Sequence, residues 1–190
     1  MTMEKHFVQF LSPGTFVSEM TASRKMPERI NLGRHFASVM ASPMMQLREW
    51  KENPRGVNPL GLRTVMGYCL PTWQRGLVWS DAQKISFIES AWRGISLGTY
   101  TYNQADMGSP FDNLLIDGQQ RLYAIQCYLN DDFPVFGWHW SEVTVVDRRV
   151  WEMTVHFNSY VTNTEDESYL RGYYNLMNFG GVAHKESERA

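Results

Sequence analysis

Apolar residues at helical spacing predict a helix that begins after Ser80. Ser80 is placed to cap this helix, and Gln83 three residues later completes a capping box. The apolar positions follow the helical period at Ile85, Ile88, Ala91 and Trp92. Gly94 is placed to end the helix. The pattern therefore predicts one amphipathic helix with both of its ends marked.

Short apolar runs predict three strands before position 118. They cover Thr64–Leu70, which Pro71 ends, Leu97–Tyr102 and Asn113–Ile116. The third strand runs directly into a second helix, whose core face is formed by Leu122, Ile125 and Leu129. This interleaving of strands and helices is typical of a small domain in which both share one core.

Alternation of apolar and polar residues predicts further strands near residues 143–145 and 151–157. A turn is expected between them at Asp147–Arg149. A last helix is predicted at Asp166–Met177, and the segment Asn178–Gly181 stops it. Together these elements predict the α+β (mixed α/β) fold class.

The first sixty residues differ from the rest because they are irregular and rich in Met, Pro and Ser. Short helices are predicted there at Glu28–Met40 and Met44–Lys51, followed by a loop with two Asn-Pro pairs. We therefore divide the chain into a helical or irregular N-terminal extension, residues 1–60, and one domain, residues 61–190.

Composition excludes several classes of function. The net charge of −2 argues against a purely electrostatic grip on DNA or a membrane. Residues 1–63 contain nine basic and five acidic side chains, so this part of the chain could contact phosphates. The two cysteines lack metal-ligand spacing, and no apolar run has the length of a signal peptide or membrane span. We expect a cytoplasmic protein without a membrane partner, whose seven Trp are buried or stack on bases.

The junction at Asp117 is the sharpest candidate for chemistry. The start of a helix exposes backbone N–H groups and the positive end of its dipole, and Gly118 lets a phosphate approach. Arg121 could bind phosphate oxygens, Asp117 a divalent cation or a nucleophile, and Gln119 and Gln120 a sugar, base or water. The alternative is that Asp117 merely caps the helix and Gln120 completes a capping box.

A second candidate cluster precedes the helix that Ser80 caps. Gln74 and Arg75 follow the end of a strand, with Trp73 and Trp79 as flanking planes. The alternative places both Trp side chains in the core and Arg75 in a salt bridge.

Taken in order, these segments resemble the N-terminal domain of GmrSD-type modification-dependent restriction systems. That family carries a DGQQR signature, which Asp117–Arg121 matches, and Leu122 matches the Leu that follows the signature in the family. Its Pro-x-x-Gln-Arg segment with a later Trp is matched by Pro71, Gln74, Arg75 and Trp79, and its Asn-x-Gly-Gly segment by Asn178, Gly180 and Gly181. The resemblance covers residues 64–184.

The resemblance implies a fold of the ParB/sulfiredoxin superfamily, with a small mixed sheet flanked by helices and a phosphate site beside the signature. It also implies that nucleotide hydrolysis is linked to work on DNA, often between bacteria and their phages. Catalytic roles fall to Asp117, Gln120 and Arg121, and Asp117 is the Mg²⁺ ligand. Nucleotide-binding roles fall to Gln74, Arg75, Trp79, Gly118, Gln119, Asn178, Gly180 and Gly181.

The chain departs from the family in two ways. Tyr123 stands where the family usually has Thr, and no nuclease half with a His/Asn cluster is present, as in compact single-domain versions from phages. We expect an enzyme that hydrolyses a nucleoside triphosphate (ATP, GTP or CTP, which the sequence does not distinguish) or transfers its phosphate with Mg²⁺. The alternatives are a module that binds a nucleotide or modified DNA base and switches a partner, and a small DNA-binding decoy. A protein partner or a homodimer is compatible with each.

Overall fold

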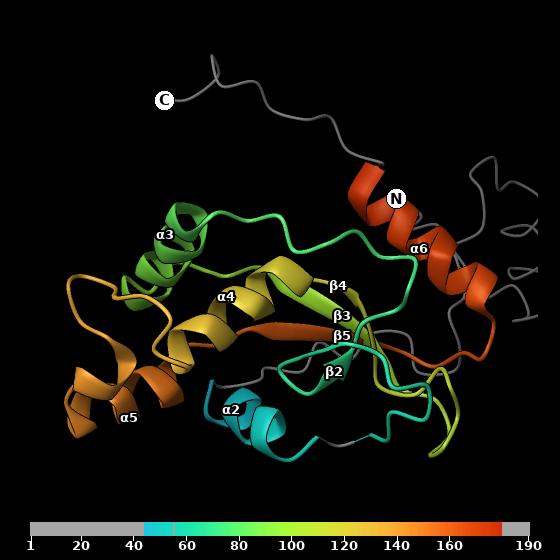
Figure 1. The fold of residues 1–190 in the computed structure, drawn as a ribbon, viewed down its shortest axis with the longest axis horizontal. Coiled ribbons are helices and arrows are strands. Elements are labelled where there is room, and N and C mark those ends of the chain that lie inside the picture. Colours follow the sequence, from blue (N-terminus) through green and yellow to red (C-terminus); the bar gives the residue numbers. More distant parts are fainter. Residues whose placement is uncertain (1–43, 55, 180–190) are drawn as a thin grey trace, which may run out of the picture. The chain divides into compact units, whose positions relative to one another are not determined.

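The computed structural model describes residues 44–54 and 56–179, and a five-stranded sheet lies at the centre of this part (Figure 1). The strands lie in the order β1-β2-β4-β3-β5. Their bounds are β1 Thr64–Val65, β2 Tyr68–Cys69, β3 Thr99–Asn103, β4 Leu114–Asp117 and β5 Asn158–Thr162. β2 is parallel to β4, β4 antiparallel to β3, and β3 parallel to β5. The sheet is therefore mixed, and β4 is its middle strand.

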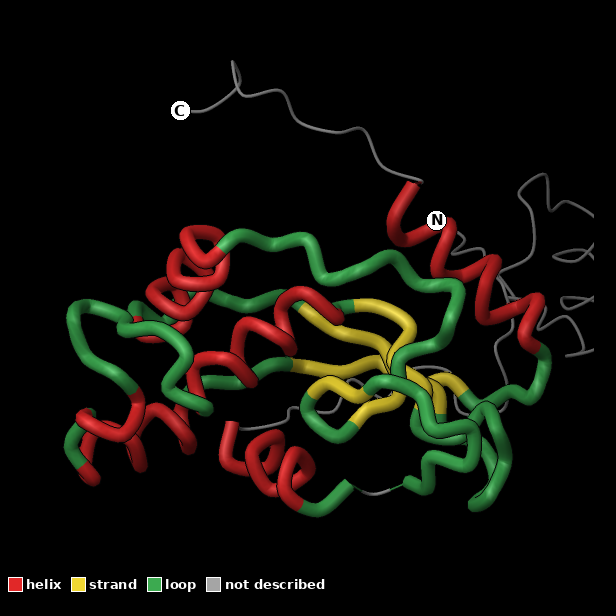
Figure 2. Tube along the Cα trace, in the orientation of Figure 1, coloured by secondary structure: helices red, strands yellow, loops and turns green. Residues whose placement is uncertain are grey.

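Helices lie on both faces of this sheet (Figure 2). They are α2 Met44–Glu52, α3 Asp81–Trp92, α4 Gln119–Leu129, a short 3₁₀ turn at Trp140–Glu142, α5 Val145–Thr154 and α6 Glu167–Phe179. The predicted α+β class is thus confirmed. Among the described helices, none is both long and apolar enough to cross a membrane.

β4 is buried on both faces. Successive side chains of a strand point to opposite sides, and an apolar cluster lies on each side of β4. Leu115 joins the larger apolar cluster with residues of α2, α3 and α4. Leu114 and Ile116 join a smaller cluster with Leu170 and Tyr174 of α6. Burial on both faces explains why β4 has no polar residue until Asp117.

Several local predictions are confirmed. Ser80 caps α3, its hydroxyl accepts a hydrogen bond from the Gln83 N–H, and the Gln83 side chain accepts one from the Ser80 N–H. Gly94 follows α3 with φ +73°, which suits a glycine after a helix. The helix predicted at Met44–Lys51 corresponds to α2, which buries Trp50 in the core. The helix predicted at Glu28–Met40 lies outside the described residues.

The single strand predicted at Thr64–Leu70 is wrong. The segment forms the hairpin β1–β2, which turns at Met66 and Gly67. Gly67 has φ +83°, and a Cβ there would collide with the backbone carbonyl of Trp50. The apolar run concealed this turn because Gly67 is its only turn residue, and its role depends on the distant helix α2.

The strands predicted near 143–145 and 151–157 are also wrong, because this segment contains helix α5. Thr144 caps the helix by accepting a hydrogen bond from the Asp147 N–H at 3.1 Å, so the predicted turn at Asp147–Arg149 lies inside the helix. Trp151 and Glu152 are the buried residues of α5, and its valines face solvent. The alternation therefore did not mark a buried face, and the strand begins later, at β5.

Candidate functional site

The junction between β4 and α4 is built around Gly118. Gly118 has φ +93° and is the N-cap of α4, and a Cβ there would lie 2.5 Å from the Cβ of Tyr100. No side chain caps the first turn of α4, so its leading N–H groups have no side-chain acceptor among the described residues. The alternative that Asp117 caps the helix is therefore wrong, and the helix start is open to an anion.

Arg121 is held in place by contacts on three sides. Its Nη2 donates to Oδ2 of Asp117 at 2.8 Å, and its Nη1 donates to the Leu97 carbonyl at 3.4 Å. The guanidinium lies 5.5 Å from the centre of the Phe157 ring. The side chains of Arg121 and Asp117 keep 25% and 17% of their exposure. The pair is therefore oriented by the fold and still reachable by a ligand.

Gln120 fixes the loop that precedes α3. Its Oε1 accepts hydrogen bonds from the N–H groups of Val78 at 3.0 Å and Trp79 at 3.2 Å, and its Nε2 donates to the Gly76 carbonyl at 2.9 Å. Both the oxygen and the nitrogen of this amide are thus bonded to backbone groups, and these bonds hold the loop at Gly76–Trp79 against the start of α4. In this arrangement Gln120 positions the loop.

Gln74 and Gln119 each have one buried acceptor that finds no partner among the described residues. The Gln74 Nε2 donates to the carbonyls of Leu115 and Ile116, at 2.5 and 2.9 Å, and the Gln119 Nε2 donates to the Arg75 carbonyl at 2.9 Å. Because carbonyls only accept, these bonds fix which way each amide points. The Oε1 atoms of Gln74 and Gln119 are buried and accept no hydrogen bond in the described part of the chain. A ligand or water that donates would satisfy them.

One cavity of about 120 Å³, here called the junction cavity, joins these groups. It is lined by every predicted site residue that the structure describes: Gln74, Arg75, Trp79, Asp117, Gly118, Gln119, Gln120, Arg121 and Asn178. Gly180 and Gly181 lie outside the described residues. Ile116 and Tyr174 also line the cavity, although the sequence did not single them out. A signal for Tyr174 existed, since it lies one turn before Asn178, whose Nδ2 donates to the Tyr174 carbonyl at 2.9 Å.

The surroundings of Trp73, Trp79 and Arg75 test whether the second cluster forms a ligand site or is purely structural. Trp79 is half-buried, lines the junction cavity, and meets the Phe87 ring edge-on at 5.5 Å. Trp73 instead packs against Tyr174 on the α6 side of the sheet. Arg75 is exposed and makes no ion pair with any described residue. The predicted salt bridge of Arg75 is therefore not formed within this part, and its charge stays available at the cavity.

The donor set of the junction cavity limits which metal it could hold. Within residues 44–54 and 56–179, no three His, Cys, Asp or Glu side chains form a metal-binding group. Mg²⁺ often takes only one or two protein carboxylates and completes its shell with water and substrate phosphates. Asp117 supplies one carboxylate here. The residues therefore fit an ion that arrives with a phosphate ligand and do not form a cage of their own.

A family profile described as the N-terminal domain of the GmrSD restriction endonuclease matches residues 60–188. The match spans more than half of the 190 residues and contains the whole described lining of the junction cavity. No curated protein and no solved structure matches the chain significantly. The relation to the ParB/sulfiredoxin superfamily stays a prediction.

Proposed function

Because this chain belongs to the family of the GmrSD restriction endonuclease N-terminal domain, which links it to restriction systems and DNA defence, we propose that it binds a nucleoside triphosphate. The phosphates occupy the junction cavity. The observation that carries the proposal is the convergence of the uncapped start of α4 with Arg121 and Arg75 on this one cavity. Backbone N–H groups, the helix dipole and two guanidinium groups all favour phosphate oxygens.

The proposed reaction is hydrolysis of the terminal phosphate or its transfer to an acceptor. An oxygen of water or of the acceptor forms a bond to the terminal phosphorus, and the bond to the bridging oxygen breaks, which leaves the nucleoside diphosphate. The proton that the attacking oxygen loses passes to solvent. Mg²⁺ held by Asp117 would neutralise phosphate charge. Arg121 and Arg75 stabilise the charge that builds up on the transferred group. The buried Oε1 of Gln119 accepts a hydrogen bond from the attacking group and orients it.

A thermal-shift screen of the purified chain tests this proposal. ATP, GTP, CTP and UTP are each added with Mg²⁺, and a ligand at 100 times its Kd should stabilise the fold by about 2.7 kcal/mol. We expect one nucleotide to raise Tm and Arg121→Ala to abolish the shift. Arg93→Ala is the matched control, because Arg93 also pairs with a carboxylate four residues earlier and stacks on a ring, yet does not line the cavity. No shift with any nucleotide would contradict the proposal.

The Asp117–Arg121 bond favours a second candidate, a nucleotide-dependent switch without turnover. A carboxylate that a guanidinium already engages at 2.8 Å is less available to a metal ion or to the attacking group. In that case the chain binds a nucleotide and passes the signal to a partner chain. Phosphate release separates the two candidates: many turnovers per chain support the enzyme, and stabilisation without release supports the switch.

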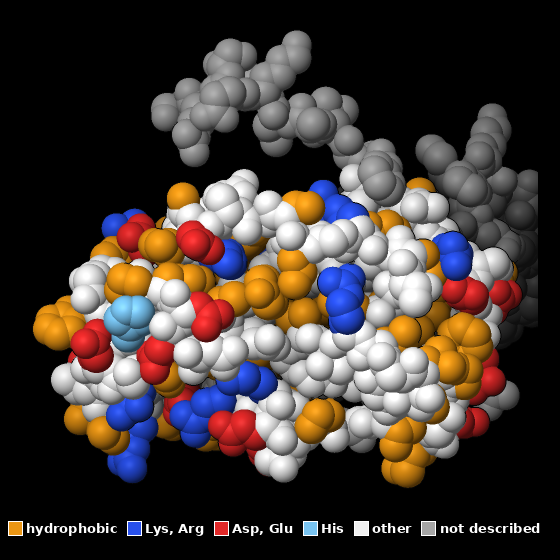
Figure 3. All heavy atoms as spheres, viewed as in Figure 1, with side chains coloured by type: hydrophobic (Ala, Val, Ile, Leu, Met, Phe, Trp, Pro, Cys, Tyr) orange, Lys and Arg blue, Asp and Glu red, His pale blue; other side chains and the backbone are white. Residues whose placement is uncertain are grey.

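DNA is the partner that the family favours, and a direct contact is part of the proposal. On the face shown in Figure 3, Lys and Arg side chains are interspersed with Asp and Glu. DNA that contacts this face would displace few counterions, so for this face we expect an affinity that depends only weakly on salt. A steep loss of binding between about 50 and 200 mM salt would instead indicate an extensive phosphate interface.

A further inference from the structure

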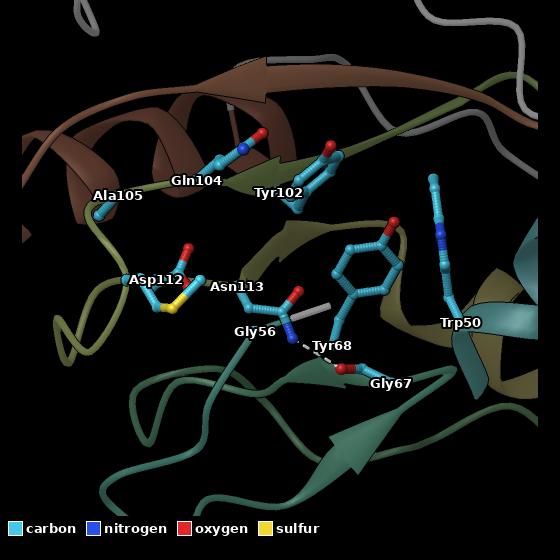
Figure 4. A pocket seen from close by; sticks show the side chains of 10 residues that line it. Trp50, Gly56, Gly67, Tyr68, Tyr102, Gln104, Ala105, Asp112 and Asn113 are labelled. Atoms are coloured by element: carbon cyan, nitrogen blue, oxygen red, sulfur yellow. Dashed lines mark hydrogen bonds between the residues drawn. The ribbon is translucent and has the colours of Figure 1, made fainter. Parts of the chain in front are cut away.

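A second cavity of about 200 Å³, here called the aromatic cavity, lies at the other end of β4 (Figure 4). Asp112 and Asn113, directly before β4, form one side of it, and none of its lining residues lines the junction cavity. Its volume is room for roughly six water molecules at about 30 Å³ each, which suits a small molecule. The residues used below are Trp50, Tyr68, Tyr102, Gln104, Asp112 and Asn113.

Aromatic rings from three separate elements form one wall of this cavity. Tyr68 on β2 and Tyr102 on β3 have ring centres 5.0 Å apart with their planes at 45°, and Trp50 on α2 meets Tyr68 edge-on at 6.1 Å. Sandwiching a flat base between two rings needs about 7 Å, two contacts of about 3.5 Å each. Tyr68 and Tyr102 are closer than that, so the rings form a continuous wall and leave no slot between them.

The opposite side of the aromatic cavity presents hydrogen-bond acceptors. Asn113 Nδ2 donates to the Gly67 carbonyl at 2.7 Å, and in Figure 4 its Oδ1 points away from that bond, toward the tyrosines. Asp112 keeps only 9% of its exposure and makes no ion pair with any described residue. Burial raises the pKa of Asp112, and backbone N–H groups of Asn113 and Ala105 offset this only in part. A buried carboxylate without a cation is costly.

We propose that the aromatic cavity binds a small organic cation, namely an ammonium group that carries alkyl carbons. Electron-rich ring faces attract such cations, and a buried carboxylate supplies the opposite charge. The alkyl carbons contact Trp50, Tyr68 and Tyr102, and the N–H or polarised C–H groups face Asp112 and the Asn113 oxygen. Gln104, exposed at the edge of the cavity, leaves a route from solvent. This inference does not depend on nucleotide binding at the junction cavity.

Calorimetric titration of the full chain with matched probes tests the proposal. The probes are choline, putrescine, and 3,3-dimethyl-1-butanol, the uncharged carbon analogue of choline. We expect a cation to bind at least about tenfold more tightly than the alcohol, a difference of about 1.4 kcal/mol. Equal binding of choline and the alcohol would overturn the proposal, as would no binding of either cation up to about 10 mM.

Variants locate the bound cation. Asp112→Asn keeps the shape of the side chain and removes its charge, and it should weaken cation binding at least about tenfold. Asp106→Asn is the matched control, because Asp106 is an exposed carboxylate in the same loop and does not line the cavity. Equal affinity in wild type and Asp112→Asn overturns the assignment. If Asp112→Asn does not fold, the comparison of choline with the alcohol on the wild-type chain decides.

Discussion

The two ends of β4 carry cavities of opposite chemical character. After Asp117 the chain passes through Gly118 into α4, so this end presents helix N–H groups and Arg121. Before Leu114 the chain turns through Asn113, whose φ is +57°, and this end presents a carboxylate and aromatic rings. One strand thus separates a site suited to anions from a site suited to cations. The direction of the α4 backbone gives the junction cavity its preference for anions, and side chains from distant segments give the aromatic cavity its preference for cations.

The two cavities also differ in how their walls are held. At the junction cavity, the signature glutamines bond to the backbone of the loop 74–79. At the aromatic cavity, ring packing forms the wall, and Gln126 of α4 ties the β1–β2 hairpin by accepting from the Met66 N–H at 2.7 Å. Helix α4 therefore supports both cavities, through Gln120 on one side and Gln126 on the other.

Gly118→Ala should have the largest effect and damage the junction cavity first. The left-handed backbone costs an alanine roughly 1–2 kcal/mol, and the contact with Tyr100 adds about 1–3 kcal/mol. We expect the free energy of unfolding to fall by about 3 kcal/mol and nucleotide stabilisation to disappear. Urea denaturation with and without nucleotide measures both effects.

Gly94→Ala is the control for that change. Gly94 has φ +73°, but nothing lies within 4 Å of an added Cβ. It should therefore cost only the backbone term of roughly 1–2 kcal/mol and leave nucleotide binding intact. Similar losses in Gly94→Ala and Gly118→Ala would show that the close approach to Tyr100 is not what makes Gly118 necessary.

Gln120→Ala should have the next largest effect and separate the supports of the two cavities. The variant removes three hydrogen bonds to loop groups that water can partly replace, so we expect a loss of about 1–2 kcal/mol in stability. Nucleotide affinity should fall because Arg75 and Trp79 are no longer held in place. Titration of the nucleotide after a check of folding by circular dichroism measures this.

Gln126→Ala on the same helix is the matched control. It removes the bond to Met66 and should cost about 1 kcal/mol without changing nucleotide affinity. If both variants weaken nucleotide binding equally, the effect belongs to α4 as a whole, and the loop contacts of Gln120 do not explain it.

The sequence allowed the junction cavity to be predicted because its signals are local. Asp117, Gly118 and Arg121 are adjacent along the chain, and the Ser80–Gln83 capping box marks where the facing loop ends. The resemblance then linked this segment to Gln74 and Asn178, which local patterns alone do not connect. What the residues bind stays a prediction.

The aromatic cavity was not predicted because no local pattern contains it. Tyr68, Tyr102 and Asp112 meet because β2 and β3 both pair with β4, and helix α2 adds Trp50. Neither strand order nor the packing of α2 is encoded in hydrophobic spacing. The misassigned segments have a related cause. The turn at Gly67 lies within an apolar run that is typical of one strand, and apolar residues in and around α5 alternate with polar residues as in a strand. In each case contacts with distant residues decide the structure.

Asp112→Asn should have the smallest effect on stability and sharpen the contrast in charge between the two cavities. Burial raises the pKa of folded Asp112 above its ordinary value of 3.8, so the folded state holds its proton more tightly than the unfolded state does. The stability that this proton gives is fully present below pH 3.8 and is lost as pH rises through the raised pKa. Wild type should therefore lose stability relative to Asp112→Asn across that window. At pH 7 the ligand-free variant should equal or exceed wild type by less than about 1 kcal/mol.

Denaturation of both chains from pH 3 to about pH 8, with Asp106→Asn as the control for an exposed charge, measures this difference. Saturating choline should reverse the order at pH 7, because only the wild-type carboxylate gains a cation. If Asp112→Asn is instead less stable than wild type by more than about 1 kcal/mol without ligand, the chain itself must stabilise the carboxylate. The aromatic cavity would then need no cation, and the opposition between the two ends of β4 would be one of shape alone.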